Sequence, residues 1–138
     1  MDVSFSRNTP PSCDSYIDSE NSHFRIHYGN CGSTYVYATP DYLNSVAEAA
    51  EYSRNLLLYM GFNPNDDDAD GIYDIYLTLR TPGDYGVNYP SSEGGSYITI
   101  DNDFINFECT YSDCYDVSSP LEIMQVTVAH EFFHAVQR

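Results

Sequence analysis

Two histidines and a glutamate near the end of the sequence have the spacing that metal chemistry requires. Residues 130–134 read His-Glu-Phe-Phe-His, so His130 and His134 are four residues apart. On a helix this spacing places both imidazoles on one face, where they can bind the same ion. Zinc lowers the pKa of a bound water to about 7, and Glu131 stands where it can accept that proton. The predicted chemistry is hydrolysis by a zinc-activated water, with Glu131 as the general base.

The segment that carries these residues has the sequence signals of a helix. Ser119, Pro120 and Glu122 form a capping box with proline at the first helical position. Apolar residues occupy nearly every side of the segment, which predicts a buried helix. Thr127 and Ile123 share the stripe of the histidines and are expected to line the floor of the site. The alternative is a pair of core histidines with hydrogen-bonded partners, but three buried polar groups are costly without a metal.

The rest of the chain is expected to supply strands and one further helix. Residues 1–22 are rich in Ser, Pro, Asn and Asp and predict an irregular lead-in to a single domain over 23–138. Strands are predicted at 23–28, 35–39, 72–79 and 96–100, with 87–95 as loop or a weak edge strand. A helix opens at Pro40 and ends near Met60, because Gly61 is a stop signal. Its polar side is expected to carry Glu48, Glu51 and Arg54. The predicted class is α+β.

Several stretches taken together are similar to a known group of enzymes. The stretch VTVAHEFFHAVQ, after GSYITIDNDF and the earlier PDYLNSVAEAAEYSRNLLLYMGFNP and DGIYDIYL, resembles the N-terminal part of secreted bacterial zincin-type zinc metallopeptidases. The likeness runs from about Phe24 to Arg138. It implies a zincin-like upper subdomain with a small mixed sheet, a backing helix, an edge strand near residues 96–100 that binds extended peptide, and a C-terminal active-site helix. It also implies zinc ligation by His130 and His134.

The third zinc ligand of that family is expected from farther along the chain. Zincins take it from a His after a Gly or from a Glu on a later helix, but Gln137 stands at the Gly position and the sequence ends at Arg138. Catalytic zinc sites normally have three protein ligands. We therefore expect a partner chain or a C-terminal subdomain to complete the site, as in the N-terminal part of a longer peptidase. Four upstream residues are the alternative donors: His23, His27, Asp101 and Asp103.

An acidic run predicts a second metal site of a different kind. Residues 66–71 read Asp-Asp-Asp-Ala-Asp-Gly and contain D-x-D-x-D-G, the first half of an EF-hand-like calcium loop. Gly71 permits the sharp turn, but Leu77 stands where the bidentate Glu of such a loop belongs. A solvated acidic turn is the alternative to calcium. The candidate calcium ligands are Asp66, Asp68, Asp70 and Asp74.

The cysteines favour an oxidising compartment. Four cysteines allow three pairings, and the pairs Cys13–Cys31 and Cys109–Cys114 are favoured because each closes a local loop bounded by turn residues. Disulfides of this kind are typical of extracellular proteins, and four reduced thiols are the alternative. The first residues contain no apolar signal core, so either a signal peptide has been removed or the protein is intracellular.

The charge balance limits the partners. The chain has 21 acidic residues against five arginines, for a net charge of −16, which repels nucleic acid and anionic membranes and attracts divalent cations. No apolar run approaches the ~20 residues that span a bilayer. The function expected is a zinc-dependent endopeptidase, or its N-terminal catalytic half, acting on a peptide or protein substrate. The rival is a non-catalytic zincin-derived structural or assembly module that binds calcium outside the cell.

Overall fold

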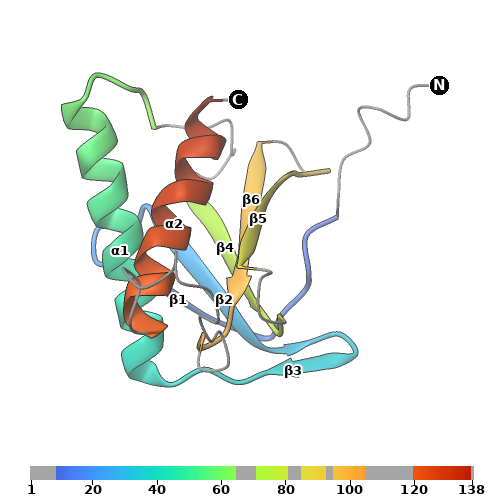
Figure 1. Ribbon diagram of the computed structural model, residues 1–138. Coiled ribbons are helices and arrows are strands. Elements are labelled where there is room, and N and C mark those ends of the chain that lie inside the picture. The colour runs from blue at the N-terminus through green and yellow to red at the C-terminus, as the bar shows by residue number, and fades with distance from the viewer. Residues whose placement is uncertain (1–8, 65–70, 81–84, 93–94, 105–119, 138) are drawn as a thin grey trace, which may run out of the picture.

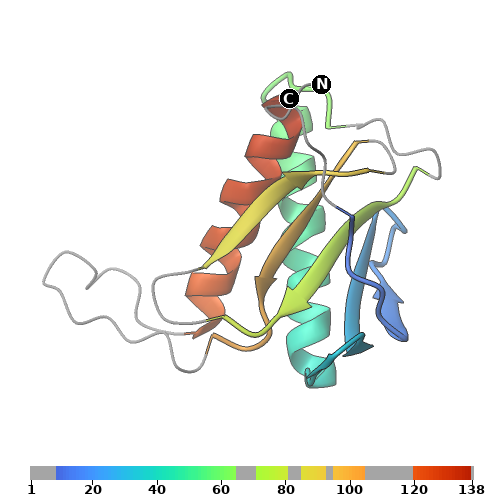
Figure 2. The same ribbon diagram turned by 90° about the vertical axis from the view of Figure 1, so that its right-hand side faces the viewer.

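The fold is known from a computed structural model that describes residues 9–64, 71–80, 85–92, 95–104 and 120–137. Both helices lie on one face of a six-stranded sheet (Figures 1 and 2). The elements in chain order are β1 (Ser15–Asp18), β2 (Phe24–Cys31), β3 (Thr34–Val36), α1 (Pro40–Tyr59), β4 (Tyr73–Thr78), β5 (Gly86–Pro90), β6 (Ser96–Asp101) and α2 (Pro120–Gln137). The predicted α+β class is confirmed.

The sheet is mixed, and its strand order is β1-β2-β4-β6-β5, with β3 paired to β2. The central strands β2, β4 and β6 are parallel to one another, and β1 and β5 run antiparallel at the two edges. The prediction that residues 96–100 form the edge strand is therefore wrong, because β6 lies between β4 and β5. Every residue of β6 is buried. The edge strand is instead β5, whose Pro90 is tolerated there since an edge strand can spare one ladder hydrogen bond.

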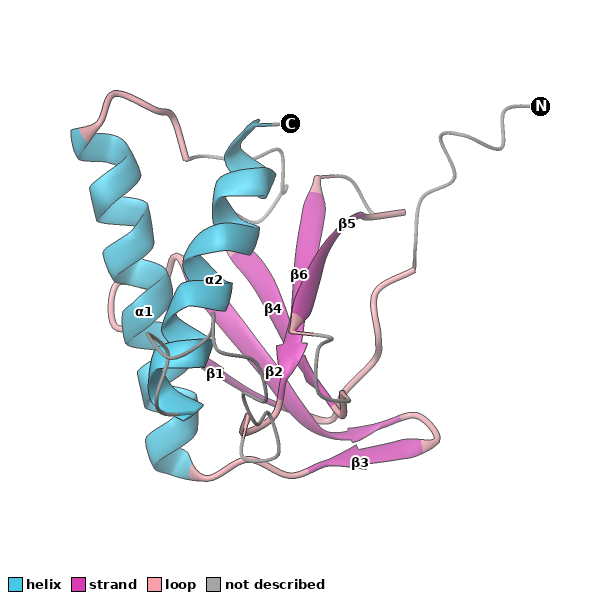
Figure 3. Ribbon diagram, in the orientation of Figure 1, coloured by secondary structure: helices cyan, strands magenta, loops and turns pink. Residues whose placement is uncertain are grey.

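The two helices lie against one face of the sheet (Figure 3), and the buried core is made of residues from both helices and from the strands. Alternate residues of a strand point to the same face, so each central strand contributes two or more apolar side chains to it. Phe24 and Tyr73 meet Phe132 of α2 edge-on, with ring centroids 5.1 and 5.5 Å apart. The other large contributors are Ile26, Ile75, Leu77, Ile98, Ile100, Val46, Met124 and Val128. The helix α2 is thus held against the sheet by its buried stripe, which fixes the orientation of its opposite side.

Helix α1 begins and ends where its sequence signals predict. The Thr39 side chain accepts a hydrogen bond from the Tyr42 amide at 3.1 Å, and Pro40 occupies the first turn. At the other end Gly61 has a φ of +93°. The amide of Phe62 there donates to the Leu57 carbonyl at 2.9 Å, as in a Schellman motif. Local chemistry therefore fixes both ends of this helix.

The lead-in is more ordered than its composition predicts. Strand β1 lies within residues 1–22 and pairs with β2. The predicted disulfide Cys13–Cys31 is present beside it and ties the two segments together. Such a bond is typical of an oxidising environment. The other predicted pair, Cys109–Cys114, lies outside the described residues. Of the two described helices, neither has the length and apolar character to cross a membrane.

Candidate metal centre

The two histidines of the motif converge on α2. Their Nε2 atoms are 3.0 Å apart, and the ring planes are nearly perpendicular at 86°. Two donors on one tetrahedral zinc, each about 2.0–2.1 Å from the metal, lie about 3.3 Å apart. The pair therefore needs only a small adjustment to place one ion between His130 and His134.

Glu131 lies beside the pair and is far less exposed. Its Oε2 atom is 4.0 Å from the Nε2 atom of His130, whose side chain is 64% exposed against 13% for Glu131. A carboxylate at this distance is too far for a strong hydrogen bond to the imidazole. It is close enough to contact a water held at the histidine pair. The arrangement is one in which a general base stands next to a metal position without occupying it.

The prediction of a helix buried on every side is wrong for α2. Its buried residues form one stripe toward the sheet, and Val126 on the outer side is 59% exposed. The two-layer fold covers a single face of the helix in the part of the chain that the structure describes. Both histidines lie on the exposed side. The energetic argument against metal-free histidines, which assumed that they are buried, therefore does not apply to His130 and His134.

A cleft opens between α2 and the edge strand. It has a volume of about 460 Å³ and is lined by Glu131, His134 and Gln137 of α2 and by residues 86–88 of β5. Gly86 permits this close approach. A Cβ atom there would lie 2.7 Å from the Thr99 carbonyl oxygen and 3.0 Å from the Thr127 methyl group. One wall of the cleft is thus an edge strand, and the other carries the base and a histidine.

A buried polar network fixes the strand wall of this cleft. The Asn88 side-chain amide donates to the Tyr73 hydroxyl at 2.8 Å and to the Ser96 hydroxyl at 3.1 Å. These two hydroxyls are 2.6 Å apart. Because the three residues come from three strands, the network holds β5 in register with β4 and β6. The cleft is therefore built on rigid elements on both sides.

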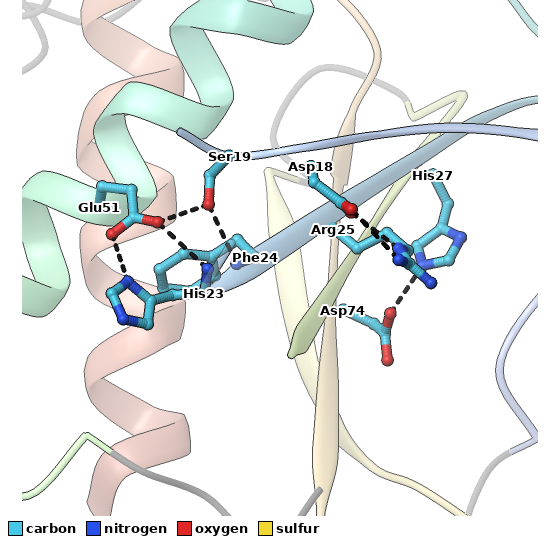
Figure 4. Close-up of polar contacts among 8 residues, drawn as sticks. All are labelled: Asp18, Ser19, His23, Phe24, Arg25, His27, Glu51 and Asp74. Carbon is cyan, nitrogen blue, oxygen red and sulfur yellow. Dashed lines mark hydrogen bonds and ion pairs between the residues drawn. The ribbon is translucent and has the colours of Figure 1, made fainter. Parts of the chain in front are cut away.

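The upstream residues considered as third ligands are engaged elsewhere. Figure 4 shows His23 at Glu51 and His27 at Asp74, and in each pair the ring nitrogen is 2.7 Å from a carboxylate oxygen. The carboxylate of Asp101 accepts hydrogen bonds from the Arg80 and Phe104 amides at 2.8 and 2.7 Å. Asp103 likewise joins no cluster with the pair on α2: among the described residues, no three His, Cys, Asp or Glu side chains are grouped as a metal site would need.

The candidate calcium ligands are only partly described. Asp66, Asp68 and Asp70 lie outside the described residues. Asp74 lies on β4, where its Oδ1 atom contacts the Nε2 atom of His27. A calcium loop at residues 66–74 therefore stays a prediction.

One buried carboxylate was not expected from the sequence. Glu51 of α1, predicted on the polar side of the helix, is only 8% exposed. The Ser19 hydroxyl donates to its Oε2 atom at 2.5 Å, and His23 contacts its Oε1 atom. Burial raises the pKa of Glu51, but the hydrogen bonds from Ser19 and His23 and the charge of His23 outweigh it, so the pKa lies below its ordinary value. The available signal was its spacing of four residues from Ala47, which is also buried.

The geometry of α2 thus combines two convergent nitrogen donors, an adjacent carboxylate and a cleft beside an edge strand. This combination can bind a transition metal, and it can hold a proton acceptor beside an extended chain. Protein-family models, curated proteins and solved structures were each compared with this chain, and none of the three comparisons finds a match.

Proposed function

We propose that this chain carries the catalytic helix of a zinc-dependent endopeptidase, with His130 and His134 as zinc ligands and Glu131 as the general base. The observation that carries the proposal is the convergence of the two Nε2 atoms, 3.0 Å apart, on the side of α2 where the cleft opens. Imidazole nitrogen is a preferred zinc donor, and the four-residue spacing on a helix suits one ion.

The residues of the chain divide the work of hydrolysis. A bound zinc ion supplies a Lewis acid and a water of lowered pKa. Glu131 accepts a proton from the attacking water and returns it to the leaving amine. Its low exposure keeps bulk water from competing for the carboxylate, which strengthens its interaction with a water at the histidine pair.

An extended peptide is the substrate that the cleft favours. No described strand pairs with the outer edge of β5, so a peptide can add there as a further strand. Residues 86–88 of that strand line the same cleft as Glu131 and His134. A peptide bound along β5 would therefore run past the proposed metal position. This assignment moves the substrate strand from residues 96–100 to residues 86–90.

The third zinc ligand is proposed to come from outside the described residues. The side chain of His130 is 64% exposed, which leaves room for a further donor. A C-terminal subdomain and a partner chain are two sources that fit. The disulfide Cys13–Cys31 supports an extracellular site of action, where such a peptidase would digest peptide or protein.

Two variants test the proposal on the purified, chelator-treated chain. Zinc titrated by calorimetry is expected to bind at about one ion per chain, and binding is expected to be lost in His134→Ala. Glu131→Gln is expected to keep the zinc and, in the assembly whose third ligand completes the site, to lose hydrolysis of a quenched fluorescent peptide library. Absence of zinc binding above the level of His134→Ala would contradict the proposal for this chain.

A second function is favoured by one observation, namely that the described residues include no third ligand. In that case the chain is a non-catalytic structural or assembly module, with calcium bound at the acidic run. Calcium would then raise the melting temperature, and zinc would not. The two functions are separated by the zinc titration and by a parallel thermal unfolding experiment with each ion.

A further inference from the structure

A second hollow lies between the two helices, on a face separate from the cleft. It has a volume of about 950 Å³ and is lined by residues of both α1 and α2. Five large side chains in its lining are apolar and substantially exposed: Tyr52, Leu56, Met60, Leu121 and Val126. Contiguous exposed apolar surface of this kind marks an interaction site more often than a bare solvent face.

The shape of this groove follows from the alternation of small and large residues. Ser45, Ala49 and Ser53 recur every four residues on α1 and line the groove together with Ala129 of α2. Larger side chains stand on the two sides, so the helices leave a trough between two ridges. The lining runs along α1 from Ser45 to residue 60, which is about 22 Å at 1.5 Å per residue. A third helix of about four turns matches that length.

The charges around the groove indicate what kind of helix could bind there. Glu48 lines it, and the exposed acids Asp41 and Glu122 lie on the same two helices. We call these three residues the acidic rim. Within the described parts of these helices the one arginine is Arg54, which lines a different cavity beside His23. The whole chain carries a net charge of −16. A second copy would bring the same acidic rim, and like charges oppose such a contact.

We propose that the groove binds an amphipathic helix of about four turns from a protein partner, with an apolar face and basic flanks. The apolar face would fill the trough, and the flanking Lys or Arg side chains would meet the acidic rim. The docking stripe on α2 includes Ala129 and Phe133, whereas Glu131 and His134 face the cleft. The proposal therefore stands apart from the peptidase proposal and does not require zinc.

A designed peptide tests the groove directly. The probe is a labelled peptide of about 15 residues, with leucines on one helical face and lysines on the flanks. Fluorescence anisotropy is expected to show saturable one-to-one binding that weakens as salt is raised. Leu56→Asp and Val126→Asp are each expected to weaken binding about tenfold or more. The matched control is Tyr35→Asp, on the distant β3, where the residue is 67% exposed and binding should not change.

Further measurements decide against the proposal or for it. Circular dichroism must show that the groove variants fold, and His134→Ala must bind the peptide as the parent does. A peptide of the same composition with its leucines spread around the helix should not bind, and one with glutamates in place of the lysines should bind more weakly. Equal binding of either peptide overturns the proposal. So does concentration-dependent dimerisation in ultracentrifugation that Val126→Asp abolishes, because the occupant is then a second copy.

Discussion

The two pairs of histidines in this chain lie in opposite environments. His23 immediately precedes β2 and His27 lies on it, and each contacts a carboxylate oxygen at 2.7 Å. His130 and His134 face each other on α2, and the neighbouring Glu131 carboxylate is 4.0 Å from the nearer imidazole nitrogen. The first two are satisfied by the fold itself. His130 and His134 present their nitrogen atoms to ligands from solvent.

This difference separates structural histidines from candidate ligands. A histidine that is fixed by a carboxylate holds two segments together and has one ring nitrogen already engaged. Two imidazole nitrogens that face each other at 3.0 Å are close to the separation at which one tetrahedral metal ion would bind both. The distinction makes predictions for each pair, and the largest expected effect concerns Glu51, the carboxylate that contacts His23.

Replacing Glu51 by alanine should strongly destabilise the fold. The change leaves the hydroxyl of Ser19 and the ring and amide of His23 without their partner in a largely buried place. The expected loss is about 3 kcal/mol in the free energy of unfolding, measured by urea denaturation. Glu48→Ala on the exposed side of the same helix is the matched control and should change stability by less than about 0.5 kcal/mol. Equal losses of stability in the two variants would show that the contact between Glu51 and His23 does not stabilise the fold.

Zinc affinity should depend on the histidines of α2 and not on His23 or His27. His134→Ala is expected to lower zinc affinity about 100-fold or more, which is ~2.7 kcal/mol, because one donor alone holds the ion poorly. His27→Ala should leave zinc affinity unchanged while it lowers the melting temperature, since it removes the contact to Asp74. Calorimetric titration with zinc and thermal unfolding of the same samples provide both readouts. A loss of zinc in His27→Ala would remove the distinction between the two pairs.

The approach of the edge strand to α2 should depend on Gly86. In Gly86→Ala the added methyl meets the Thr99 carbonyl oxygen of β6 and the Thr127 methyl group of α2, so β5 must shift away from both elements. We expect a loss of about 1–3 kcal/mol in the free energy of unfolding. If the cleft acts as proposed, peptide hydrolysis should fall further than zinc affinity, because the strand moves and the ligands do not. The control is Gly32→Ala in the turn between β2 and β3, where a Cβ meets nothing within 4 Å and backbone strain at positive φ is the only effect.

The sequence predicts where the helices and strands of this fold lie better than it predicts which elements pack beside one another. Thr39, Pro40 and Gly61 mark the ends of α1 by local hydrogen bonding, and the Cys13–Cys31 bond closes a short loop. The interior position of β6 follows from its parallel pairing with β4, which no local pattern specifies. The exposure of α2 follows in the same way from the number of layers that the fold stacks on it.

The candidate site shows the same division between local and distant contacts. The convergence of His130 and His134 is a property of one helical turn, so the motif alone predicts it. The environment of Glu51 depends on Ser19 and His23, which are 32 and 28 residues away in sequence. Helical spacing can place Glu51 on the same face as Ala47, but it cannot report which distant residues Glu51 contacts.

The pH dependence of stability should carry the signature of Glu51. Its pKa lies below the ordinary value of 4.5 in the folded state. The stabilisation from its ionised form is therefore fully present above about pH 4.5 and is lost as the pH falls through the lower, folded pKa. Urea denaturation between pH 7 and pH 3 should show a decline for the parent that is shallower in Glu51→Gln. Parallel declines in the two proteins would mean that Glu51 does not contribute to acid unfolding.

The smallest effect is expected at the ion pair on the open face of the sheet. Asp18 accepts hydrogen bonds from Arg25 at 2.8 and 3.2 Å, and the pKa of Asp18 lies below its ordinary value chiefly because of that contact. Both side chains are partly in water, where an ion pair contributes little. Asp18→Asn should therefore cost about 0.5 kcal/mol, and the difference from the parent should shrink further at high salt. A loss as large as that of Glu51→Ala would show that burial does not determine how strongly a carboxylate binds its partner in this fold, and the contrast between buried and open sites would fail.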